Sequence, residues 1–232
     1  MRLLFLLISL FIFTAATTVT AQRISRVTYG IDIGSGFSSG IYTPSFNYYQ
    51  NLTFGNFPYV GIGWTGRFSG NVIGDNPVLS TIGNPGGEED EISLKKIVAY
   101  NASFGVTVNF DFEHIEFGAN VDLLNISMGR TSKVLYNIAN LAAATDSSAK
   151  FHGTRVDAYP QMANLLPIAT RKSAGNSEAY IRLWINQEVG IKLGYQLLNV
   201  VYNTADRLNN RQRRFENQYG MPFVALSFHI QN

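Results

Sequence analysis

The sequence contains no cysteine among its 232 residues. Neither a disulfide framework nor a lipid-modified cysteine anchor is therefore available. The mature fold has to be held together without covalent cross-links, by packing, hydrogen bonds and ion pairs alone.

Charge and long apolar runs are also scarce. Charged residues make up 15% of the chain, against about 25% in typical soluble domains. After residue 22, no segment approaches the roughly 18 uncharged apolar residues of a membrane helix. The formal net charge of +2 indicates no general attraction to nucleic acid. Aromatic residues are abundant at 13%, and the apolar residues are spread by alternation, as membrane strands require.

The first 21 residues have the features of a secretory signal peptide. Arg2 precedes an apolar run from Leu3 to Phe13, and small residues follow up to Ala21. The apolar core is too short to span a bilayer as a helix. We therefore predict cleavage near Ala21, export of the chain, and one mature domain over residues 22–232.

The stretch from Ile97 to Ile126 has the clearest secondary-structure signal, an alternation of period two in two arms. The apolar residues of the two arms are Val98, Tyr100, Ala102, Phe104, Val106, Val108 and Phe110, then Ile115, Phe117, Ala119, Val121 and Leu123. This pattern predicts a β-hairpin with a turn over residues 111–114 and Phe110 paired with Ile115. Soluble strands average about 5 to 6 residues. The arms approach the 9 to 11 of a tilted membrane strand.

Six further strands are predicted, which brings the count to eight. They are residues 27–37, 57–68, 72–82, 178–185, 189–197 and 223–230. The connections alternate between long ones, such as residues 38–56 and 128–176, and short ones, such as residues 69–71 and 186–188. This rhythm predicts an all-β fold, an eight-stranded antiparallel up-and-down transmembrane β-barrel with long outer loops and short periplasmic turns.

By strand pattern and loop rhythm, residues 23–232 resemble the small eight-stranded outer-membrane barrels, such as the OmpA transmembrane domain and OmpX, and the PorT-like β-barrel family. The resemblance implies an integral protein of the cell outer membrane, in contact with outer-membrane lipid. No cofactor and no nucleic-acid partner is expected.

Seven charged residues fall on the polar face of their predicted strands. They are Asp32, Arg67, Asp75, Glu116, Asp122, Arg182 and Lys192. The interior of an eight-stranded barrel is just wide enough for side chains to fill it, so these charges have to pair. We expect a salt-bridged core, with Asp75 beside Arg67; a narrow ion or solute path is the alternative.

The histidines and Ser227 do not form a recognisable catalytic or metal-binding pattern in the sequence. Ser227 and His229 invite a comparison with lipid-cleaving barrel enzymes, but no nucleophile-elbow sequence surrounds them. His114 and His152 lie in a predicted turn and a predicted loop, and three scattered histidines do not make a metal site. We therefore predict no catalytic residue and no metal site.

The predicted loop over residues 128–176 is too long for a plain connection. Val134, Leu135, Ile138 and Leu141 recur at helical spacing after Ser132, which predicts a short capped helix. Six basic residues against two acidic ones give residues 130–176 a net charge of +4. They are Arg130, Lys133, Lys150, Arg155, Arg171 and Lys172 against Asp146 and Asp157. We hypothesise that the segment covers the outer mouth or docks a surface protein, and that its basic residues contact lipopolysaccharide phosphates.

The sequence favours a non-enzymatic outer-membrane β-barrel with a role in surface contact or envelope integrity. Three alternatives stay open: a barrel enzyme acting on lipid, a narrow solute channel or transport accessory, and a secreted soluble β-sandwich.

Overall fold

A computed structural model describes residues 24–55, 57–81, 89–112, 114–144, 149–167 and 173–230. The predicted signal peptide lies outside the described residues, as do Asp146, Arg171 and Lys172. The described chain forms one antiparallel sheet of thirteen strands. Among these residues, no helix has the length and apolar character needed to cross a membrane.

The strands differ widely in length. The long ones are β1 (Ile24–Ser38), β2 (Ile41–Phe54), β3 (Phe57–Ile73), β6 (Ile97–Phe112), β7 (Ile115–Gly129), β11 (Gly175–Trp184), β12 (Val189–Thr204) and β13 (Arg214–His229). The short ones are β4 (Val78–Thr81), β5 (Glu91–Ser93), β8 (Ser132–Asn137), β9 (Arg155–Pro160) and β10 (Ala163–Leu165), with 3-10 turns η2 (Leu141–Ala143) and η3 (Asn209–Arg211).

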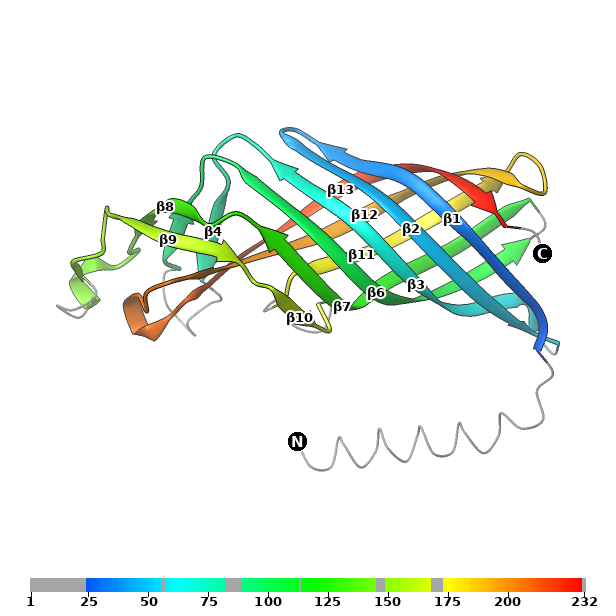
Figure 1. The fold of residues 1–232 in the computed structure, drawn as a ribbon, viewed down its shortest axis with the longest axis horizontal. Coiled ribbons are helices and arrows are strands. Elements are labelled where there is room, and N and C mark those ends of the chain that lie inside the picture. Colours follow the sequence, from blue (N-terminus) through cyan, green and yellow to red (C-terminus); the bar gives the residue numbers. More distant parts are fainter. Residues whose placement is uncertain are drawn as a thin grey trace, which may run out of the picture.

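The eight long strands pair in a closed cycle, the eight-strand ring. Its order is β1, β2, β3, β6, β7, β11, β12, β13 and back to β1. Figure 1 shows β1, β2, β3, β6 and β7 running side by side, with β11, β12 and β13 crossing them at the opposite slope on the other wall of the ring. The prediction of an all-β antiparallel fold is confirmed. The predicted count of eight strands is wrong, because five short strands extend the same sheet to thirteen.

One long strand replaces a predicted loop. Residues 41–54 form β2, which pairs along its whole length with β1. Its abundance of Tyr, Asn and Ser suggested a loop, yet Thr43, Asn47 and Asn51 are buried on one face of the strand while Tyr42 and Phe46 are exposed on the other. A two-residue turn precedes it, and Gly40 there has φ +67°, a conformation that glycine adopts without strain.

The predicted strand over residues 72–82 is also wrong. Val72 and Ile73 end β3, and only the short β4 follows after a turn. Asp75 and Asn76 in this turn have φ of 58° and 55°, which removes both from a regular strand.

The predicted hairpin is present, with its register shifted by two residues. Phe112 pairs with Ile115, and Phe110 pairs with Phe117. A shift of two keeps every side chain on its predicted face. A bulge at Leu123 then moves the outward positions to Leu124 and beyond.

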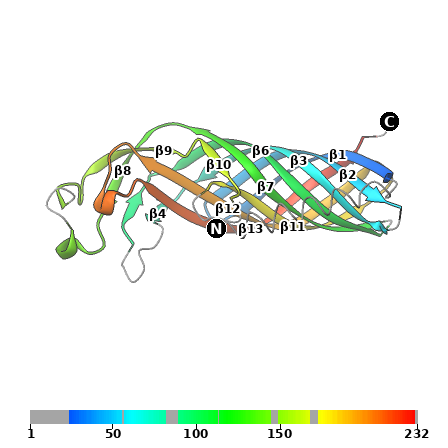
Figure 2. The ribbon, with the colours of Figure 1, turned by 90° about the horizontal axis from the view of Figure 1, so that it is seen from below.

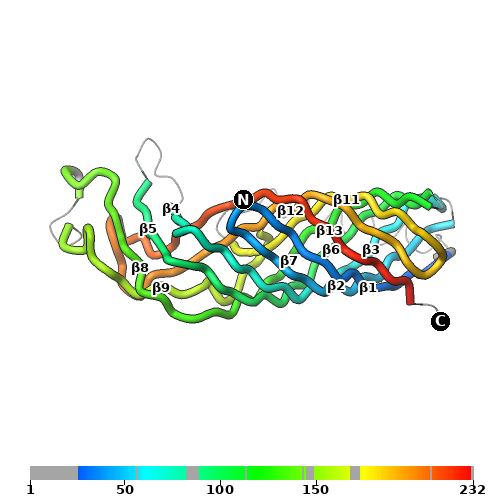
Figure 3. The backbone as a smooth tube through the Cα atoms, turned by 90° about the horizontal axis from the view of Figure 1, so that it is seen from above, coloured from blue at the N-terminus to red at the C-terminus, as the bar shows by residue number. Residues whose placement is uncertain are grey.

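The shorter strands form a second closed cycle, the six-strand ring. It consists of β4, β5, β8 and β9 together with β12 and β13, which belong to both rings. Figures 1, 2 and 3 show β8, β9 and β4 at one end of an elongated molecule, away from the end of β13 near the C-terminus. The helix predicted after Ser132 is wrong. Val134 and Tyr136 point into this ring and Leu135 points out, so the segment alternates as a strand.

The two rings have opposite polarity. On the eight-strand ring the exposed outer face is apolar, with Phe68 and Tyr100 exposed to 65% and 64%, whereas buried residues inside include Arg182 and Lys192. The six-strand ring instead encloses an apolar core, part of which continues into the adjacent end of the eight-strand ring. Its members include Leu79, Ile92, Val134, Tyr136, Val156, Tyr202 and Phe215, with Ile73, Ile97, Leu198 and Met221 at the junction.

Candidate functional site: a charged cluster inside the eight-strand ring

Strand pairing brings charged residues from distant segments to one level of the ring. Glu116 on β7 pairs with Arg182 on β11, and Arg182 pairs with Lys192 on β12. Asp32 on β1 pairs with Ser227 on β13. Because directly paired residues point to the same face of a sheet, all five side chains enter the interior together.

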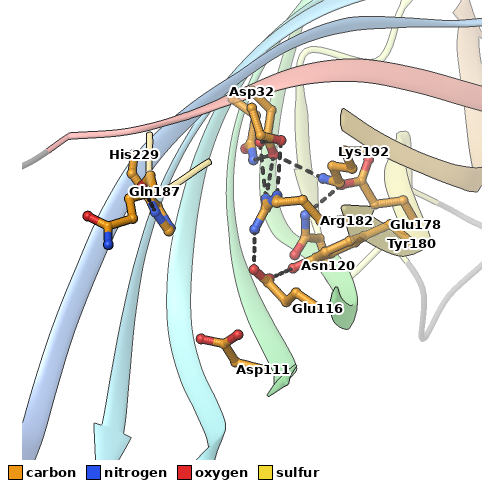
Figure 4. A network of polar contacts seen from close by, with 12 residues as sticks. Asp32, Asp111, Glu116, Asn120, Glu178, Tyr180, Arg182, Gln187, Lys192 and His229 are labelled. Atoms are coloured by element: carbon orange, nitrogen blue, oxygen red, sulfur yellow. Dashed lines mark hydrogen bonds and ion pairs between the residues drawn. The ribbon is translucent and has the colours of Figure 1, made fainter. Parts of the chain in front are cut away.

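Arg182 occupies the centre of this group (Figure 4). Its Nη1 donates to Glu116 Oε2 at 2.7 Å, and its Nη2 donates to Asp32 Oδ1 and Oδ2 at 3.0 and 3.1 Å. Its Nε donates to Ser227 Oγ at 2.9 Å. The guanidinium carbon also lies 4.4 Å from the ring centroid of Tyr49, within the range of a cation–π contact.

A second cation continues the network. Lys192 Nζ donates to Asp32 Oδ2 at 3.1 Å and forms an ion pair with Glu178. Glu178 in turn lies with Oε2 3.1 Å from Arg67 Nη2. Three carboxylates and three cations therefore alternate along one continuous network of ion pairs, which we call the charged cluster. Its members are Asp32, Arg67, Glu116, Glu178, Arg182 and Lys192.

Every member of the charged cluster is buried, with at most 5% of the residue exposed. Neutral donors complete the coordination of the carboxylates. Tyr180 donates to Glu116 at 2.9 Å, and Ser227 donates to Asp32 at 2.7 Å. Such extensive pairing offsets much of the desolvation cost of buried charge.

The structure tests the seven predicted interior charges one by one. Asp32, Arg67, Glu116, Arg182 and Lys192 are brought together in the cluster. Asp122 is buried nearby, where its Oδ2 accepts a hydrogen bond from the backbone N–H of Asn176 at 2.9 Å.

The prediction that Asp75 lies inside the barrel beside Arg67 is wrong. Asp75 lies exposed in the turn after β3, so it cannot pair with Arg67. The partner of Arg67 is Glu178, which is the first residue of the strand predicted over residues 178–185 and was not included among the predicted interior charges. The alternation Glu178, Tyr180, Arg182 on one face was the signal that could have identified it.

The Ser227 and His229 side chains have separate partners. Ser227 is fully buried and is held by Asp32 and Arg182. His229 stacks on Trp184 with ring centroids 3.8 Å apart, and its Nδ1 lies 3.0 Å from the Gln187 carbonyl oxygen. A serine engaged in this way is not oriented by that histidine as a nucleophile would be.

A cavity of about 900 Å³ opens at the end of the ring near Trp184 and His229, lined also by Arg26, Asp111 and His114. Figure 4 shows Asp111 and His229 apart from the charged cluster. Among the residues that the structure describes, no group of three or more potential ligands could hold a metal ion.

Two comparisons with known proteins found no match. No protein-family model and no curated protein matches the chain. Any function has to be argued from the geometry itself.

That geometry indicates a closed interior. The charged cluster links β1, β3, β7, β11 and β12, and the apolar core fills the end of the eight-strand ring that joins the six-strand ring. Each member of the charged cluster forms an ion pair with at least one opposite charge.

Proposed function

We propose that the protein is a non-enzymatic integral outer-membrane β-barrel, and that the eight-strand ring is its eight-stranded, up-and-down transmembrane part. The observation that carries this proposal is the reversed polarity of the ring. Large apolar side chains cover its outside, including Trp64, Phe104, Val106 and Ile181 at 38% exposure or more, while ion pairs fill its inside. Water would penalise such an exterior, whereas lipid favours it.

Closure of the ring supports the same conclusion. Each of the eight long strands pairs with two neighbours in a closed cycle, and lipid cannot satisfy a free strand edge. β11 is the shortest long strand, but β10 pairs with β7 where β11 has not yet begun, and Leu165 there pairs with Leu124. Both side chains are exposed, so the apolar outer face continues across this gap.

We infer that the six-strand ring stands outside the bilayer and provides the surface-contact or envelope-integrity role. Its outer positions Lys133, Arg155 and Asp157 are exposed and polar, whereas Val134 and Val156 are buried. This is the pattern of a protein in water. The ring lies at the end opposite the turns that join β2 to β3, β6 to β7 and β11 to β12, which corresponds to the outer side in such barrels.

Fractionation and gel mobility test the proposal. We expect the mature protein in the outer-membrane fraction, with faster migration on an unheated gel than after heating because the barrel stays folded in detergent. Replacing residues 132–160 with a Gly-Ser linker should preserve this heat-dependent shift, because no ladder of the eight-strand ring uses those residues. A water-soluble protein without heat-dependent mobility would refute the assignment.

A planar-bilayer measurement addresses the channel alternative. The charged cluster and the apolar junction both obstruct the axis, so we expect no large stable conductance. A porin-sized current step would contradict the closed interior and favour transport.

A further inference from the structure

The outer wall of the eight-strand ring carries an apolar groove of about 830 Å³ that crosses β13, β1, β2, β3 and β6. Four exposed aromatic side chains line it: Tyr42, Phe46, Phe68 and Tyr100. Its volume falls within the range of about 300 to 1,000 Å³ that is usual for small-molecule sites. A second apolar hollow, of about 610 Å³, lies elsewhere on the outer wall over β6, β7, β11 and β12, but only the first is lined by Tyr42 and Tyr100 near the end that meets the six-strand ring.

The groove can be traced to particular residues in the sequence. Pairing of β2 with β3 runs through Tyr42 and Val72 and resumes only at Ser45 and Ser69. Pro44, in the interrupted part, has no backbone N–H to donate. Nearby, a Cβ added to Gly70 would lie 3.6 Å from Pro44 Cγ and 3.7 Å from Tyr100 Cδ1, which is ordinary van der Waals contact, so the glycine forms the floor of the groove between these two side chains.

Basic side chains lie at the end of the groove nearest the six-strand ring. Lys96 directly precedes Ile97, which pairs with Ile73 at the end of β3. Arg130 follows the end of β7, next to the start of β6. Lys95, Lys96 and Arg130 are all exposed. These three cations, together with one exposed carboxylate, Asp75, two residues after Ile73, lie beyond the Tyr42 and Tyr100 end of the groove. Their net charge of +2 stands on the side where headgroups lie in the proposed membrane orientation.

We propose that this groove binds one acyl chain of an anionic lipid of the bilayer, with the lipid phosphate held by Lys95, Lys96 and Arg130. The proposal rests on the proposed function. The groove is continuous with the apolar wall, so a lipid tail is the occupant already present at high concentration. The cationic border favours a net negative headgroup over a zwitterionic one.

The test uses a matched pair of glycines. Gly70→Leu fills the groove, whereas Gly66→Leu adds the same side chain to the same outer face of β3, outside the groove, where the nearest atom to an added Cβ is Trp64 Cζ3 at 3.9 Å. The full chain is reconstituted in vesicles of phosphatidylethanolamine and phosphatidylglycerol, transferred to detergent, and analysed by native mass spectrometry. We expect retained phosphatidylglycerol in the wild type and in Gly66→Leu, and about a tenfold loss in Gly70→Leu.

A second arm tests the headgroup. Lys96→Gln with Arg130→Gln should lower retention of phosphatidylglycerol and leave phosphatidylethanolamine unchanged, whereas Lys133→Gln, on the six-strand ring, should change neither. Equal retention in Gly70→Leu and the wild type, or a protein dimer that Gly70→Leu abolishes, would overturn the lipid site.

The readouts separate the two proposals. Insertion into vesicles and the heat-dependent gel shift report the barrel, whereas lipid retention reports the groove. A wild type that inserts but retains no lipid contradicts the groove alone. A wild type that does not insert contradicts both.

Discussion

β12 and β13 each belong to two rings of opposite polarity. Along β12 the inward side chains change from Lys192 and Gln196 to Leu198 and Val200, with all four buried. On the opposite face of the same strand, the exposed Leu193 and Leu197 give way to the partly buried Asn199 and Asn203. Apart from Val201, an outward residue that is buried to 1% exposure, the alternation of period two continues while its sense reverses. Both faces of β12 therefore change polarity where the strand passes from the eight-strand ring into the six-strand ring.

The two interiors are stabilised by different forces. In the eight-strand ring, hydrogen-bonded ion pairs fill a space that is surrounded by apolar side chains on the outside. In the six-strand ring, buried side chains such as Leu79 and Phe215 supply hydrophobic burial, the usual driving force of folding in water. Four substitutions, taken from the largest expected effect to the smallest, distinguish the two.

The largest effect is expected for Arg182→Ala, which leaves Asp32 and Glu116 without their shared partner. Removing one member of a buried ion pair costs about 3 to 5 kcal/mol. Urea unfolding of the protein in vesicles measures this loss. The control is Arg26→Ala, which breaks the 3.9 Å contact of an exposed arginine with Asp111 and should cost at most about 1 kcal/mol. Similar losses in both variants would contradict the central role of Arg182.

The second-largest loss of stability is expected from truncating a side chain of the apolar core. Leu79 is fully buried in the six-strand ring, so Leu79→Ala should cost about 2 to 5 kcal/mol of that ring's stability. Leu135→Ala, at a side chain 39% exposed on the outside of the same ring, is the matched control. Amide hydrogen exchange in β4 and β5 reports the difference. Faster exchange throughout β1 and β2 as well would show that the rings unfold as one unit.

The third prediction compares an arginine introduced on the outside of the eight-strand ring with one introduced on the outside of the six-strand ring. Val106 on β6 and Leu135 on β8 have the same exposure of 39%. Under the proposed function, Val106→Arg meets lipid and should impair folding into vesicles by about 2 to 4 kcal/mol, whereas Leu135→Arg meets water and should change little. The folded fraction on unheated gels measures both. Equal tolerance would remove the distinction between the faces.

The smallest effect concerns Tyr136 inside the six-strand ring. Its hydroxyl donates to Asp90 at 2.8 Å, and both burial and this hydrogen bond raise the pKa of Tyr136 above its ordinary value of 10. The folded state then holds the proton more tightly than the unfolded state. This contribution is present in full below pH 10 and is lost as the pH rises toward the raised pKa.

Tyr136→Phe should therefore lower stability by about 1.5 kcal/mol at neutral pH. It should also remove the part of the alkaline destabilisation that arises from this residue. Unfolding curves of both proteins between neutral pH and pH 11 provide the measurement. Parallel decline of the two curves would assign the alkaline effect to other groups.

Alternation on the outer face was the most informative sequence signal. It correctly predicted the faces of Val106 and Phe117 even though the register was off by two, because side-chain direction repeats every second residue. It also placed Arg182 and Lys192 inside, since both alternate with apolar residues along their predicted strands.

The sequence did not predict β2 or the six-strand ring, for reasons of composition and of strand length. β2 has a polar inner face and contains Pro44, so its composition resembles a loop although both of its edges are paired in the ring. The six-strand ring was not predicted because the four strands that belong to it alone, β4, β5, β8 and β9, have three to six residues, too few to show a period. Its ladders also join segments far apart in the chain, such as Tyr202 with Pro160. Asp75 was misplaced because the turn after β3 was interpreted as strand.

The reversal of polarity along β12 is the central claim, and the absence of native cysteine makes it directly measurable. Single cysteines at Leu193, Leu197, Asn199 and Asn203 would carry a spin label in the reconstituted protein. Collision rates with oxygen, which concentrates in lipid, are compared with those of a water-soluble nickel complex. We predict that labels at Leu193 and Leu197 collide mainly with oxygen and that the label at Asn203 collides mainly with nickel. High nickel accessibility at all four positions would contradict the account.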